Sequence, residues 1–179
     1  MNTESNNPLQ PGIMSNSLIQ VLIDNYRQNH LSAINTALGI DDANSIWFDL
    51  PKLKNFIAKI EEEAAKVNPS ASDEDLGIRF YYASYPKTEN WDIMASHPVP
   101  QEYAEKHTLV LIPTIKKTDE SGVAYHSDFN TLQADGGDNR AIGLSTARSA
   151  AYKHSEDDGT VGENSGILIP PAPPMGTSY

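Results

Sequence analysis

The sequence predicts an α+β fold, in which a small antiparallel sheet has two helices packed on one face. Apolar residues recur with helical spacing in two stretches before residue 68, and β-prone runs follow them. After Phe129 the chain holds seven of its 11 glycines and only two aromatic residues. We therefore expect the ordered core to precede that point and the C-terminal third to be irregular.

The length of 179 residues is typical of one domain. Composition divides it into four parts. We expect a flexible N-terminal arm, an α+β core, an irregular wrapping segment and an apolar, proline-rich tail, at residues 1–12, 13–129, 130–166 and 167–179.

The first helix is predicted from Ser15, because Leu18, Leu22 and Tyr26 recur at intervals of four residues. The apolar pattern continues to Gly39, a residue suited to the left-handed conformation that ends many helices.

The second helix is predicted for residues 50–66, after a brief strand at 45–48. Asp49 is placed as the N-cap, and Pro51 lies in the first turn, where its missing N–H costs nothing. One face of this helix is apolar and carries Leu53, Phe56, Ile57, Ile60 and Ala64.

Three strands complete the predicted sheet. Residues 78–85 are apolar on one side, residues 108–115 are apolar on both faces as in a central strand, and residues 123–129 alternate. Pro113 cannot donate to a strand ladder, so it indicates a bulge or a change of pairing partner. The long connection at 86–106 is expected either to be functional or to be shortened by a helix from Gln101.

Charge and composition exclude several classes of function. The formal net charge is −11, so we expect neither a nucleic acid nor a membrane as partner. There is no cysteine, which excludes disulfides and thiol chemistry. No signal-peptide pattern and no long apolar run is present, which favours a cytoplasmic location, although a mature exported protein would look similar.

No metal-ligand spacing, nucleophile motif or phosphate-binding loop is present, so no metal site and no cofactor is predicted. The sequence leaves open whether a weakly bound cation lies near Asp135 and Asp138. The best catalytic cluster combines His126 and Asp128, two apart on one strand, with Arg79 and Tyr81. The alternative is that these residues are solvent-facing positions of an edge strand.

The tail is the stronger binding signal. Its apolar triplet is β-prone and its prolines favour an extended polyproline conformation. The triplet can pair with its own sheet, dock on a second copy or dock on another protein. The candidate binding residues are Ile167, Leu168, Ile169, Pro170, Pro171, Pro173 and Pro174.

Several of these motifs resemble a group of small uncharacterised bacterial proteins. In that group a helix started by Trp-Phe precedes an Ile-Arg-x-Tyr strand and a Leu-Val-rich strand, and a Pro-Pro motif closes the chain. The corresponding residues here are Trp47-Phe48, Ile78-Arg79-Phe80-Tyr81, Leu109-Val110 and Pro170-Pro171. The resemblance implies a folded bacterial domain, and it supplies no activity because none is known for the group.

We therefore expect a non-catalytic structural or protein-interaction module that assembles with itself or with a protein partner through its tail. A small-ligand enzyme or sensor, using Arg79, Tyr81, His126 and Asp128 beneath the 86–106 loop, is the alternative. An acidic immunity or inhibitor-type binding protein is the second alternative.

Overall fold

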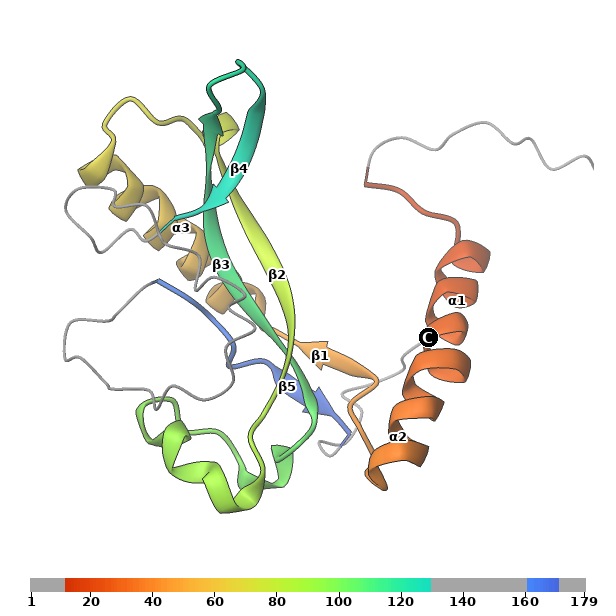
Figure 1. Cartoon of the computed structure of the whole chain (residues 1–179). Helices are drawn as coiled ribbons and strands as arrows, with labels where there is room; N and C mark the ends of the chain where they lie inside the picture. Colours follow the sequence, from red (N-terminus) through yellow and green to blue (C-terminus); the bar gives the residue numbers. More distant parts are fainter. Residues whose placement is uncertain (1–11, 130–160, 171–179) are drawn as a thin grey trace, which may run out of the picture.

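A computed structural model describes residues 12–129 and 161–170, and they form an α+β fold with two small antiparallel sheets (Figure 1). One sheet has three strands in the order β2-β3-β4, and the other has two, β1 and β5. The strands span Ser45–Trp47 (β1), Leu76–Ser84 (β2), His107–Thr118 (β3), Ala124–Asp128 (β4) and Ile167–Ile169 (β5).

The first helix runs unbroken from α1 (Asn16–Asn25) through a π-helical turn, η1 (Tyr26–Leu31), to α2 (Ser32–Leu38). We call residues 16–38 the N-terminal helix. The hydroxyl of Ser15 caps its start by accepting a hydrogen bond from the Leu18 amide at 3.2 Å. Gly39 ends it with a φ of +69°, which confirms the predicted C-terminal glycine.

The second helix, α3 (Leu50–Val67), packs on the three-stranded sheet. Asp49 caps it as predicted, because its carboxylate accepts a hydrogen bond from the Lys52 amide at 2.7 Å. Phe56 and Ile60 pack with Leu111 of β3, and the other members of this cluster come from α3, both neighbouring strands and the C-terminal segment: Phe48, Leu53, Leu76, Ile78, Leu109 and Val161.

In the three-stranded sheet, β3 is central as predicted. Phe80 of β2 lies opposite Leu111, while β4 pairs with the other edge of β3 from Thr114 onward. Below β4 that same edge is taken by Glu163, which exchanges two backbone hydrogen bonds with Leu111. Pro113 lies between these two partners, which confirms the predicted change of pairing.

The long connection between β2 and β3 builds a second core. It contains the short 3₁₀ segments η3 (Thr88–Ser96) and η4 (Gln101–Tyr103), so the predicted helix from Gln101 is a single turn. Another 3₁₀ turn, η2 (Asp73–Asp75), precedes β2. Buried side chains from the connection and from both strands of the small sheet meet here: Ala43, Tyr85, Tyr103 and Leu168, with Ile46, Trp91, Met94 and Val99 packed around them.

The expected packing of two helices on one sheet face needs correction. α3 covers the sheet, whereas none of the segments of the N-terminal helix has a buried residue. Figure 1 shows this helix standing apart from the three-stranded sheet, on the side of β2. The reason is that α3 already covers the apolar residues at the start of β2.

The C-terminal third is described only at residues 161–170, which hold a bridge at Glu163 and the strand β5. The expected wrapping segment up to residue 160, with the cation near Asp135 and Asp138, lies outside the described residues, as does the chain after Pro170. Among residues 12–129 and 161–170, no helix has the length and hydrophobicity needed to cross a membrane.

Candidate interaction surface

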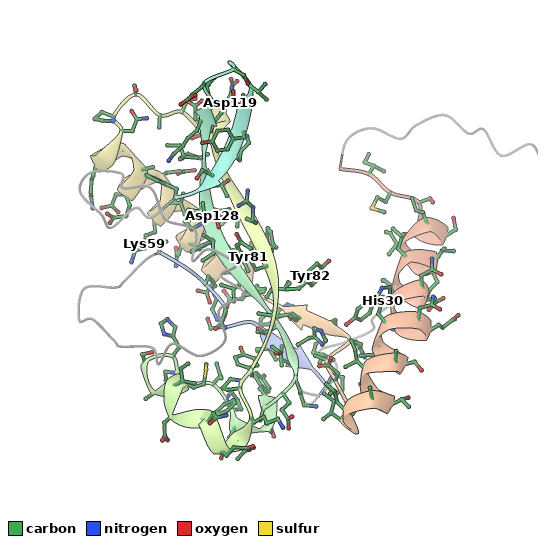
Figure 2. The ribbon with its side chains drawn as sticks, viewed as in Figure 1. His30, Lys59, Tyr81, Tyr82, Asp119 and Asp128 are labelled. Atoms are coloured by element: carbon green, nitrogen blue, oxygen red, sulfur yellow. The ribbon has the colours of Figure 1, made fainter. Side chains whose placement is uncertain are left out.

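The predicted catalytic residues lie on the sheet face opposite α3. Arg79 donates hydrogen bonds to the Asp128 carboxylate and, at 2.8 Å, to the backbone carbonyl of His126, and Tyr81 donates to the other Asp128 oxygen. The hydrogen bond with Tyr81, followed by the charge of Asp128, raises the pKa of Arg79. This arrangement ties the edge strand β2 to β4 across β3 (Figure 2).

The side chains of Arg79, Tyr81 and Asp128 therefore converge as predicted, but they bind one another and do not line a pocket. His126 contributes its backbone carbonyl. Two hollows among the described residues lie elsewhere. One, of about 340 Å³, lies between α3 and the start of β2, and the other, of about 620 Å³, lies between α3, His97 and residues 161–163. The connection expected as a lid packs into the second core instead.

The buried carboxylate of Asp42 lies in the segment that joins the N-terminal helix to β1, and it holds this segment against the start of β3. Asp42 is 1% exposed and accepts hydrogen bonds from both the backbone amide and the ring nitrogen Nδ1 of His107. Its own amide donates to the side chain of Asn35 in α2, at 3.0 Å. Among the described residues no cluster of three or more histidine and acidic side chains could hold a metal ion.

The apolar triplet of the tail pairs with the chain's own small sheet. In β5, Leu168 is fully buried and lies opposite Ile46 of β1. This is the first of the three interpretations of the triplet. Pro170 follows in a turn, and the remaining candidate prolines, Pro171, Pro173 and Pro174, lie outside the described residues.

Among the described residues, an exposed apolar surface lies instead on the N-terminal helix. Leu18, Leu22 and Leu38 are 47%, 51% and 59% exposed. The apolar residues recur every four residues up to Tyr26, and the next one, Leu31, follows after five. The π-helical turn accommodates this longer interval, because its hydrogen bonds span five residues, so Leu31 stays on the same side of the helix. We call this face the apolar stripe. It is formed by Leu18, Ile19, Leu22, Ile23, Tyr26, Leu31, Ile34 and Leu38.

A second exposed surface lies on β2, next to this helix. Tyr82 is 88% exposed and Phe80 54% exposed, although both share a sheet face with core residues that α3 covers. Figure 2 shows Tyr82 projecting toward the helix that carries His30. Partial burial, then the nearby charge of Asp42 and the Tyr82 phenol, raise the pKa of Tyr26. The stripe and the β2 aromatics are thus neighbours that remain largely uncovered.

The sequence contained a signal for this surface. Between residues 12 and 38 the only aspartate, glutamate, lysine or arginine residues are Asp24 and Arg27, so the segment has no net charge in a chain of net charge −11. Depletion of charged residues of this kind is typical of the buried centre of protein interfaces.

Comparisons with protein-family models, with curated proteins and with solved structures gave no match. The resemblance to a group of bacterial proteins is untested by them and stays an expectation.

Proposed function

We propose that the protein is a non-catalytic interaction module that associates with a second copy of itself through the apolar stripe of the N-terminal helix. The observation that carries this proposal is a helix of three consecutive segments without a single buried residue. We thus retain the prediction of self-assembly, but we place the contact surface on the N-terminal helix and not on the C-terminal tail.

The helix needs a partner for its own stability. Asparagine, serine, threonine and β-branched residues, which are weak helix formers, make up much of it. The ion pair between Asp24 and Arg27 has a nitrogen–oxygen distance of 3.9 Å and contributes little. Helices in proteins gain most of their stability from packing an amphipathic face. On this face no side chain is fully buried, and Leu18, Leu22 and Leu38 are about half exposed.

Charge favours a second copy as the partner. Two chains of net charge −11 repel each other over most of their surface. The N-terminal helix has no net charge, and β2 contributes only the cation Arg79. Two copies can therefore approach along this side without bringing like charges together.

Light scattering after size exclusion tests the proposal with two variants. Leu22→Glu places a charge in the apolar stripe, whereas Gln28→Glu places the same charge on the opposite, polar side of the helix. We expect dimers for the unmodified chain and for Gln28→Glu, and monomers for Leu22→Glu. A buried leucine contributes about 1.5–3 kcal/mol, and a symmetric dimer loses it twice, so affinity should fall roughly a hundredfold or more.

Two results would overturn the proposal. One is an unmodified chain that stays monomeric at millimolar concentration. The other is a Leu22→Glu chain that remains as dimeric as the Gln28→Glu control. The tryptophan fluorescence of the second core, which contains Trp91, serves to check that each variant is folded.

A further inference from the structure

Among the described residues, one edge of β2 has no strand beside it, and this free edge is unusually suited to pair with another strand. β2 has nine residues, pairs with β3 without interruption, and is an edge strand in the order β2-β3-β4. Natural proteins protect such edges with lysine, proline, bulges or short strands. The sequence LGIRFYYAS contains no lysine and no proline, and its one charge, on Arg79, is held by Asp128.

The hydrogen bonds of β3 identify which groups of β2 face the free edge. Leu111 uses both its N–H and its C=O for Glu163, on the side of β3 away from β2. In an antiparallel pair the opposite residue then also directs both groups outward. Phe80, opposite Leu111, therefore presents its N–H and C=O to the free edge, and the alternate residues Ile78 and Tyr82 do the same.

We propose that β2 pairs with β2 of a second copy, antiparallel and with Phe80 on the two-fold axis, so that two three-stranded sheets join into one of six strands. This inference rests on the proposed self-association and names the second surface that it uses. A symmetric contact of this kind closes as a dimer.

The register follows from matching the outward-facing residues. With Phe80 on the axis, Phe80 lies opposite its copy, and Ile78 lies opposite Tyr82 of the other chain. All nine residues of the strand then find a partner. Arg79 lies opposite Tyr81, whereas a shift that centred the strand on Arg79 would place two guanidinium groups face to face and be unfavourable.

The apolar stripe of the N-terminal helix and the free edge of β2 can contribute to the same dimer interface. A strand added to the free edge of β2 lies on the side of the sheet where the N-terminal helix stands (Figure 1). The apolar stripe and the exposed rings of Phe80 and Tyr82 can then be covered in the same association. A stable dimer buries about 800 Å² per partner, so a single strand pairing is best combined with such a helix contact.

The absence of cysteine allows a direct test of the register by cross-linking. Single variants Arg79→Cys, Phe80→Cys and Tyr81→Cys are oxidised mildly and separated on a non-reducing gel, with Tyr125→Cys on β4 as an exposed control. With Phe80 on the axis, the two Cα atoms at position 80 lie about 5.5 Å apart, within disulfide range. At positions 79 and 81 they lie about 8–9 Å apart, beyond it. We expect covalent dimers for Phe80→Cys at least tenfold faster than for the other three.

A second variant measures the pairing without a cross-link. Phe80→Lys places two ammonium groups opposite each other on the axis and should weaken the dimer at least tenfold. Tyr125→Lys adds the same charge away from the edge and should leave the dimer intact.

The outcomes separate this inference from the proposed function. A dimer in light scattering that cross-links equally at all positions, fastest at another position, or not at all overturns the pairing of β2 and leaves self-association standing. A dimer that tolerates Phe80→Lys as well as Tyr125→Lys does the same. A chain that is monomeric in light scattering overturns both.

Discussion

α3 and the N-terminal helix are both amphipathic, yet they have opposite surroundings. α3 buries Phe56, Ile60 and Ala64 against the sheet, whereas the N-terminal helix buries no residue. The apolar pattern is present in both, so the difference lies in what the rest of the chain offers each helix. An apolar face that the described residues leave partly exposed supports the proposed association with a second copy.

The first prediction contrasts one large apolar residue from each helix. Phe56→Ala should lower the free energy of unfolding of the core by about 3–5 kcal/mol, because it leaves a cavity between α3 and β3. Leu22→Ala should change it by less than about 0.5 kcal/mol when measured on monomeric protein, because Leu22 is half exposed. Chemical denaturation followed by tryptophan fluorescence measures both.

This comparison fails if the two variants destabilise the core to a similar extent. Such a result would mean that the N-terminal helix packs on its own chain in solution, and it would remove the basis for a second copy.

How far the sequence predicts this contrast depends on the range of each interaction. The helices, their caps at Asp49 and Gly39, and the change of pairing at Pro113 follow from local patterns, and the structure confirms them. Periodicity also identifies the apolar face of each helix. It carries no information about which surface covers that face, and for this reason the N-terminal helix was wrongly expected on the sheet.

Two further features depend on long-range contacts and could not be predicted from the sequence for the same reason. The apolar triplet of β5 pairs with β1, far away along the chain, and no local pattern distinguishes this from docking on another molecule. The 86–106 connection holds Trp91 and Tyr103, whose burial with Tyr85 turns an expected lid into a second core. The aromatic residues in and next to this connection are the sequence feature that could have predicted its packing into a core.

The second prediction tests how tightly the packed region is filled. A Cβ atom added at Gly166 would lie 2.8 Å from Cζ of Phe48, and it would also clash with Ile46. Gly166→Ala should therefore lower the free energy of unfolding by about 1–3 kcal/mol. At Gly162 the nearest atom to such a Cβ is Cδ1 of Ile112, at 3.4 Å. Gly162→Ala should stay within about 0.5 kcal/mol, because a flexible methyl group can yield.

Thermal unfolding of the two glycine variants provides the measurement. Equal stability of Gly166→Ala and Gly162→Ala would contradict the close approach of the C-terminal segment to β1, and with it the packed half of the comparison.

The smallest expected effect is on the titration of Tyr26 in the N-terminal helix. Burial, then the charge of Asp42 and the phenol of Tyr82, raise the pKa of Tyr26 above its usual value of 10.0. Because the folded chain holds this proton more tightly than the unfolded chain, the contribution to stability is present below pH 10 and is lost as the pH rises through the folded pKa.

The difference in tyrosinate absorbance between the unmodified chain and Tyr26→Phe reports this pKa. We expect a higher value in the dimer than in the same chain diluted to monomers, because a second copy covering the apolar stripe removes more water from Tyr26. An identical pKa in dimer and monomer would show that the dimer leaves Tyr26 as exposed as the monomer does. The association would then have to use a face of the helix other than the one nearest β2.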